Sequence, residues 1–349
     1  MMRITMMGFS RAGKTCYLYA MAARMSKGQY GFRFIPDNHW KSLSLNRCWN
    51  EMKPQFNPDN GTLVRQGVWP AGTGESDEIV FRFVYGTRNL TYFSWYDYRG
   101  GILDSESESD EKDYNKFVEI ASESACIIVC IPAEMLQAYM HGDSMAESRL
   151  NIILDDLTKY RESRNDYVPV AFAILKADCL APGEFSRGVK AIREGVFAPL
   201  FSQDENWLLM FVGVSLGKFD RNQGDIDPKT HRRFINGTLE PVNVELPVFF
   251  AFYCKLKDAV RSKNEEMNKN ANAQDIAKGK LQTHNSRTIF GRWWHGDEAK
   301  AAKAELEELA KDSGLIAADL QKLQVDFSHV TEALLDGGYV EIWNKGERL

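Results

Sequence analysis

The sequence predicts an α/β fold, a mixed and mostly parallel sheet with helices on both faces, followed by a small, mainly helical C-terminal region. Over residues 1–260, apolar runs of strand length alternate with amphipathic stretches of helix length. A glycine-rich turn joins the first of these strands to the first helical pattern. Beyond residue 260 the sequence becomes more polar and richer in Ala, Glu and Lys, a composition typical of helices.

The overall composition is that of a folded protein of one or two domains. Of the 349 residues, 44% are hydrophobic, and the formal net charge is −5. This mild acidity argues against a broad surface for nucleic acid, and no apolar run reaches the length of a membrane span. The N-terminal residues do not resemble a signal peptide, and the six cysteines fit no zinc pattern. We therefore expect a cytoplasmic protein.

The strongest local signal is a glycine-rich loop near the start of the chain. Residues 4–7 form a strand pattern, residues 17–25 form a helical pattern, and between them stands Gly8-Phe9-Ser10-Arg11-Ala12-Gly13-Lys14-Thr15. This is G-x-x-x-x-G-K-[ST], the pattern of a phosphate-binding loop, in the strand–loop–helix context that makes the pattern credible. The alternative is a chance match in an ordinary turn.

The chemistry of this loop suits a nucleotide phosphate. Gly8 and Gly13 allow a tight turn in which successive N–H groups form an anion-binding nest at a helix N-terminus. Lys14 adds a positive charge toward the β- and γ-phosphates, and the Thr15 hydroxyl can ligate Mg²⁺. The residues predicted to bind the nucleotide here are Gly8, Ser10, Arg11, Ala12, Gly13, Lys14, Thr15 and Cys16.

A second signal for the phosphates follows a predicted hairpin. Strand patterns at residues 78–85 and 90–96 are joined by a short turn. The second strand runs into Asp97-Tyr98-Arg99-Gly100, a D-x-x-G spacing. In this spacing Asp97 can hold Mg²⁺ through water, and Gly100 can donate its N–H to a γ-phosphate.

Two later strands end in residues that could recognise a base. Residues 125–132 are a continuous apolar run, typical of a buried parallel strand. The strand at residues 168–175 is followed by Lys176-Ala177-Asp178, in which the Asp can accept hydrogen bonds from guanine and the Lys stem can pack along the base. The strand at residues 207–214 is followed by Ser215 and Leu216, which match the motif position whose backbone contacts the guanine oxygen in guanine-specific switches.

These four motifs, in this order and each at a strand end, resemble the TRAFAC class of P-loop GTPases over residues 1–260. In that class the D-x-x-G motif also follows a hairpin after the first helix. Guanine-specific members carry [N/T]-K-x-D as the base motif, and here Leu175 stands where Asn or Thr is usual. We therefore expect a preference for guanine with one contact missing.

Within that class the chain looks most like the double-GTPase families of prokaryotic conflict, or anti-phage, systems. The similarities are a long segment at residues 28–72, the sequence Trp69-Pro70-Ala71-Gly72-Thr73 ahead of the hairpin, and residues 241–250 before the next helix. The resemblance implies a Ras-like G domain that uses GTP or GDP with Mg²⁺. It also implies effector or scaffold proteins of the same system as partners, and an insertion at about residues 28–72 that lies over the nucleotide.

The resemblance implies catalytic roles for several residues. Thr73 is the candidate switch threonine that reaches Mg²⁺ and the γ-phosphate, and Thr62 competes for that role. Ras-like enzymes orient water with a Gln after D-x-x-G, where this chain has Gly101, so we expect slow hydrolysis or a water held from elsewhere. The arginines of the two phosphate motifs are candidate arginine fingers, worth roughly 10³–10⁵ in rate, or else exposed residues that pair with carboxylates. The expected catalytic residues are Lys14, Thr73, Arg11, Arg99 and Gly100, and the expected metal ligands are Thr15, Thr73 and Asp97.

Residues 261–349 are predicted to form a mainly α-helical accessory region for protein interactions. The polar residues 264–277 are interpreted as a linker or frayed helix, and residues 300–311 as a helix. A short separate helix is predicted from Gly314, and a final strand at residues 339–343.

The leading hypothesis is a GTP-binding molecular switch with slow, Mg²⁺-dependent hydrolysis in a multi-protein bacterial defence system. One alternative is an ATPase of another P-loop clan that uses Asp97 as its acidic metal residue. Another is a scaffold that holds nucleotide without significant hydrolysis, which the glycine at position 101 favours.

Overall fold

The computed structural model describes residues 1–71, 76–97, 103, 108–162, 168–202, 207–219, 225–227, 231–286, 296–335, 340–344 and 347–348. The chain divides into two compact units, residues 1–251 together with 333–349, and residues 252–332. These units differ from the expected division at residue 260, because a strand near the end of the sequence pairs with the sheet of the first unit.

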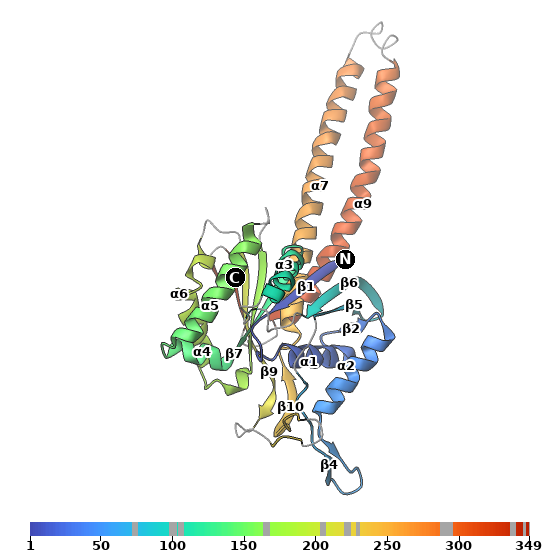
Figure 1. Cartoon of the computed structure of the whole chain (residues 1–349). Coiled ribbons are helices and arrows are strands. Elements are labelled where there is room, and N and C mark those ends of the chain that lie inside the picture. The colour runs from blue at the N-terminus through green and yellow to red at the C-terminus, as the bar shows by residue number, and fades with distance from the viewer. Residues whose placement is uncertain are drawn as a thin grey trace. The chain divides into compact units, whose positions relative to one another are not determined.

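The first unit is built on a ten-stranded mixed sheet in the order β12-β11-β9-β8-β7-β1-β6-β5-β2, with β10 paired to β9 (Figure 1). The central strands β6, β1, β7, β8 and β9 are parallel, and the flanking strands are antiparallel. The strands are β1 Met2–Met7, β2 Phe32–Pro36, β5 Asp77–Tyr85, β6 Arg88–Asp97, β7 Cys126–Pro132, β8 Val168–Leu175, β9 Trp207–Phe219, β10 Gly237–Val242, β11 Val340–Asn344 and β12 Glu347–Arg348. The predicted mixed sheet is thus confirmed, including the hairpin of β5 and β6.

Helices cover both faces of this sheet, as the sequence predicts. One face is covered by α3 (Glu108–Ser122), α4 (Ala133–Met140), α5 (Ser144–Glu162) and α6 (Glu184–Glu194). The other face carries α1 (Lys14–Lys27), where Tyr17 contacts Trp95 with ring centroids 5.8 Å apart. The first turns of α7 (Leu246–Ser286) pack on that same face, where Phe249 contacts Phe32.

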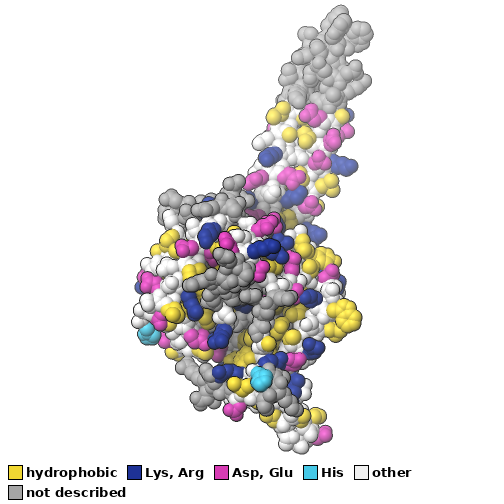
Figure 2. All heavy atoms as spheres, viewed as in Figure 1, with side chains coloured by type: hydrophobic (Ala, Val, Ile, Leu, Met, Phe, Trp, Pro, Cys, Tyr) yellow, Lys and Arg dark blue, Asp and Glu magenta, His cyan; other side chains and the backbone are white. Residues whose placement is uncertain are grey.

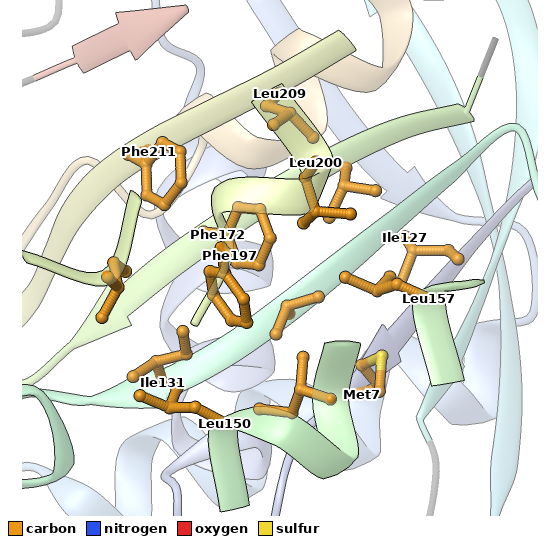
Figure 3. Close-up of a cluster of buried hydrophobic side chains, with 14 of the residues drawn as sticks. Met7, Ile127, Ile131, Leu150, Leu157, Phe172, Phe197, Leu200, Leu209 and Phe211 are labelled. Carbon is orange, nitrogen blue, oxygen red and sulfur yellow. The ribbon is translucent and has the colours of Figure 1, made fainter. Parts of the chain in front are cut away.

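Figure 3 shows a cluster of buried hydrophobic side chains, in which residues of the central strands contact residues of the helices and loops beside them. Phe172 of β8 lies between Phe211 of β9 and Phe197 after α6, with ring centroids 4.7 and 4.9 Å away. Ile127 and Ile131 of β7 are fully buried. This packing fixes the strand ends at which the predicted site residues stand.

Residues 28–72 contain elements that join the sheet and its surroundings. They include β2, α2 (His39–Met52) and a separate hairpin of β3 (Gln55–Phe56) and β4 (Leu63–Arg65). The Asn38 side chain caps α2 by accepting N–H bonds from Trp40 and Lys41. Farther along, Glu51 pairs with Arg232 at 3.0 Å, so this insertion is tied to residues far away in the sequence. Its expected position over a nucleotide stays a prediction.

The second unit consists of two long antiparallel helix segments, from α7 and from α9 (Gly296–Leu335). Tyr253 stacks on Phe327 at 5.1 Å, and farther along the Gln274 amide donates to the Leu309 carbonyl and the Ser313 hydroxyl. The linker interpretation of residues 264–277 and the separate short helix predicted from Gly314 are therefore wrong, because both segments lie inside continuous helices. The contacts between α7 and α9 stabilise both helices at positions where the polar sequence by itself predicts a break.

The predicted final strand is confirmed as β11, which pairs antiparallel with β9 from Val340–Val212 to Asn344–Leu208. None of the helices in the described ranges combines the length and apolar character that a bilayer span requires. On the face shown in Figure 2, the described basic and acidic side chains are interspersed and form no broad basic area.

Candidate functional site

The glycine-rich loop between β1 and α1 has a backbone that few residue types could adopt. Gly8, Arg11 and Gly13 have φ angles of 152°, 63° and 100°. A Cβ atom on Gly8 would lie 2.7 Å from the Cys130 carbonyl oxygen of β7, so only glycine fits there. The loop is held close against the neighbouring strand as the chain turns into α1.

The Lys14 side chain folds back across this loop. It is 7% exposed, and its Nζ donates to the carbonyl oxygens of Gly8 at 2.7 Å and Phe9 at 3.0 Å. Lys14 is also the first residue of α1, and its N-cap is Gly13, which has no side chain to accept the first helical N–H groups. A positive charge and the positive end of a helix dipole therefore lie together.

The other predicted residues of the loop differ in exposure. Ser10 and Arg11 are exposed, Thr15 and Cys16 are partly exposed, and Ala12 is buried. Within the described ranges Arg11 has no ion pair, so the geometry neither assigns it a carboxylate partner nor places it on a ligand. The space below Gly13 is filled by Leu175, whose Cδ1 would lie 3.6 Å from a Cβ at that glycine. The residue that departs from the expected base motif thus packs under the loop.

Asp97 ends β6 beside this loop, in register with Met6 near the end of β1. The side chain is 3% exposed, and its Oδ1 is buried without a hydrogen-bond partner in the described part of the chain. Burial raises the pKa of Asp97 to about 6, the Lys14 ammonium opposes this rise, and the carboxylate of Asp77 adds to it. The structure therefore brings Asp97 near Lys14.

An oxygen-seeking divalent cation fits this donor set. Asp97 presents a carboxylate oxygen that has no partner among the described residues, and Thr15 presents a hydroxyl at the start of α1. Mg²⁺ is held by few carboxylates together with phosphates and water. Thr73, Arg99 and Gly100 lie outside the described residues, so their roles stay predictions.

The predicted base residues lie just after β8 and inside β9, which does not end at residue 214 as predicted but continues to Phe219; Ser215 comes directly after the last residue of β9 paired with β8. Lys176 has a left-handed backbone with φ 59°, and its Nζ contacts Glu134 at 2.9 Å. Asp178 follows in a short 3-10 helix, and its Oδ1 accepts a hydrogen bond from the Ser215 hydroxyl at 2.8 Å. The Ser215 oxygen in turn accepts the N–H of Gly217 at 3.0 Å, and Leu216 stands between them in β9.

Beside Asp178 and Ser215 lies a cavity of about 370 Å³. Its lining includes Lys218 of β9, Glu240 of β10 and Asn243 just after β10. Sequence reasoning missed these three residues, because β10 becomes a neighbour of β9 only through pairing such as Gly237 with Phe219. The glycines in both paired segments were the available signal.

Of three comparisons with known proteins, two found no match and one found a structural likeness. No family model matches the sequence, and no curated protein matches it. Among solved structures, the chain is similar to the signal recognition particle receptor SRb-GTP/SRX complex from Chaetomium thermophilum, with a TM-score of 0.34 and 16% identity. That likeness covers 61% of this chain and 90% of the other.

Proposed function

We propose that the chain binds a guanine nucleotide with Mg²⁺ and hydrolyses GTP slowly, as a molecular switch of the TRAFAC type. The observation that carries the proposal is the buried Lys14 ammonium, folded over a loop of left-handed residues at the start of α1 and close to the buried Asp97. Such a loop has few uses other than the binding of a polyphosphate.

The start of α1 and Lys14 would bind the phosphates of the nucleotide. The N–H groups at the start of α1 and the Lys14 ammonium would bind phosphate oxygens, since a charged group and a helix dipole act together there. Thr15, Asp97 and the predicted Thr73 would hold Mg²⁺, which would neutralise charge between the β- and γ-phosphates.

The base end is supported by Asp178. The Ser215 hydroxyl orients its carboxylate by a hydrogen bond, at the same edge of the sheet as the phosphate loop. This carboxylate would accept the N–H groups of guanine. Hydrolysis would be slow, because Gly101 replaces the water-orienting Gln of Ras-like enzymes. The role in a defence system, with effector or scaffold partners, stays a prediction from the resemblance.

Nucleotide binding to the nucleotide-depleted chain tests the proposal. We expect GDP and GTP to bind with Mg²⁺ much more tightly than ADP and ATP. Lys14→Ala should weaken GDP by roughly tenfold or more, because it removes charge-assisted hydrogen bonds to phosphate. Lys27→Ala, at the exposed opposite end of the same helix, is the matched control and should bind as the unmodified chain does.

Two further measurements separate the alternatives. Asp178→Asn should lose preference for guanine while keeping the phosphate interactions, and equal binding of ATP and GTP by the unmodified chain would favour the ATPase alternative. Single-turnover phosphate release should be slow and depend on Lys14. Tight GTP binding with no release, even with partner proteins added, would leave a nucleotide-holding scaffold.

A further inference from the structure

The cavity beside Asp178 has a wall that the proposed function does not use. That wall is β10 and the residues after it, which lie along β9 past the predicted base residues (Figure 1). None of the phosphate-loop residues lines the cavity. If the proposed nucleotide binds here, the cavity would therefore hold its base and not its phosphates.

The approach of β10 to β9 is unusually close. A Cβ on Gly217 would lie 1.8 Å from the Thr238 carbonyl oxygen, and a Cβ on Gly237 would lie 2.1 Å from the Lys218 carbonyl oxygen. The pairing register shifts between Leu239 and Val242. A bulge of this kind redirects side chains, and Glu240 stands inside it.

Both ends of this wall are fixed to the rest of the sheet unit. The Asn243 amide donates to the Gly213 carbonyl at 2.9 Å, inside the cavity lining. On the other side, Arg24 of α1 donates to the Pro241 carbonyl at 2.6 Å and pairs at 2.9 Å with Glu245, which is 1% exposed. Glu240 is therefore presented by a rigid segment tied to the helix that begins at the phosphate loop.

The Glu240 carboxylate has no hydrogen-bond or ion-pair partner among the described residues. Lys218 lines the same cavity, yet no ion pair joins the two within the described part of the chain. In contrast, both oxygens of Asp178 already accept hydrogen bonds from within the protein, from the Ser215 hydroxyl at 2.8 Å and the Cys179 thiol at 3.9 Å. Glu240 is thus an exposed residue of the cavity lining whose carboxylate is available, among the described residues, beside the already hydrogen-bonded Asp178.

We propose that Glu240 is a specificity-determining residue that accepts a hydrogen bond from the 2-amino group of the base. This inference rests on the proposed function. The edge of guanine presents one ring N–H and two amino N–H groups. Asp178 already accepts two hydrogen bonds from within the protein, which leaves about two of its acceptor sites for guanine, so a second acceptor beside it matches the remaining amino N–H.

Calorimetric titration of the full chain with GDP and IDP tests this assignment, because IDP differs from GDP only in lacking the 2-amino group. The unmodified chain should prefer GDP. Glu240→Ala should reduce that preference by roughly tenfold while leaving IDP affinity unchanged, as expected for the loss of one charge-assisted hydrogen bond. Thr238→Ala, an exposed position of the same strand outside the cavity lining, is the matched control.

The outcomes are distinct. Glu240→Gln, which keeps an acceptor oxygen, should retain part of the preference. An unchanged ratio of GDP to IDP affinity in Glu240→Ala would overturn the inference, as would an equal loss for GDP and IDP, which would indicate a purely structural wall. Failure of the unmodified chain to bind GDP would overturn the proposed function itself, whereas GDP binding with an unaltered ratio would overturn only the role of Glu240.

Discussion

At the scale of single residues, the most unusual group is the carboxylate of Asp97. It is buried, one oxygen has no hydrogen-bond partner in the described part of the chain, and burial outweighs the attraction of the Lys14 ammonium. A group in this state is costly in the empty protein and becomes favourable when a cation reaches it. Such strain is typical of a site prepared for a ligand.

This state predicts a pH-dependent stability difference between the unmodified chain and Asp97→Asn. The folded-state pKa of about 6 lies above the ordinary value of 3.8, so the folded protein binds this proton more tightly than the unfolded chain. The contribution of Asp97 to the free energy of unfolding therefore falls as pH rises from about 4 to about 6. At pH 7, without nucleotide, Asp97→Asn should be more stable by about 3 kcal/mol.

Denaturant unfolding of both proteins between pH 4 and pH 8 measures this difference. Asp77→Asn, half-exposed and paired in register with Asp97, is the control and should show a smaller effect. A variant less stable than the unmodified chain at pH 7 would contradict the assigned burial cost.

The same pKa governs metal-dependent binding. Because Mg²⁺ requires the ionised carboxylate, the gain in GDP affinity on adding Mg²⁺ should shrink as the pH falls through about 6. Titrations with and without Mg²⁺ at several pH values measure it. A gain that stays constant down to pH 5 would argue against Asp97 as a metal residue.

Several residues of the candidate site could be placed from the sequence because each motif directly follows a strand pattern. Asp97 ends β6, Asp178 closely follows β8, and Ser215 follows the part of β9 that is parallel to β8; the carboxyl ends of parallel strands meet at one edge of a sheet. Glu240 and Asn243 could not be placed in this way. Their positions depend on a bulge and on a strand pairing between distant segments, for which local patterns carry no information.

At the scale of elements, the pairing of β9 with β10 depends on Gly217. Its φ is 149°, and any side chain would collide with the backbone of Thr238. We expect Gly217→Ala to destabilise the protein by about 2 kcal/mol or more, through strain and loss of close pairing. Guanine affinity should fall with it, since Glu240 and Asn243 would move.

A matched control is Gly314→Ala in the middle of α9, where a Cβ meets no atom within 4 Å. This change should stabilise its helix by about 0.5–1 kcal/mol, because alanine loses less backbone entropy than glycine. Thermal unfolding and GDP titration of both variants provide the test. Equal tolerance of alanine at both glycines would contradict the close approach of β9 and β10.

The long helices show where local sequence misleads. Gly314 and the polar residues 264–277 have the composition of breaks and linkers, and both lie inside continuous helices. Cross-helix bonds such as that from Gln274 to Ser313 supply what helical propensity alone does not. Strands of the sheet were easier to predict, because their apolar runs reflect burial directly.

At the scale of the whole molecule, residues 252–332 are an insertion in the sequence between the two segments that make up the sheet unit, residues 1–251 and 333–349. Their first and last helical turns are close, with the Tyr253 and Phe327 rings 5.1 Å apart. Replacing residues 256–324 with a short Gly/Ser linker should therefore leave the sheet unit folded and GDP affinity unchanged. A cooperative thermal transition and GDP titration measure this, and loss of either would show that the insertion supports the site.

The pairing of β11 with β9 also has a consequence for how the protein is made. A ribosome synthesises β9 first and must complete residues 220–339 before it reaches β11, a delay of roughly 6–24 s at 5–20 residues per second. During that time the backbone of Leu208–Val212 is an open strand edge, which other nascent chains can pair with. The sheet is therefore complete only once residues 340–344 have been synthesised, and until then the newborn chain has an open strand edge that rapid synthesis or a bound chaperone would protect.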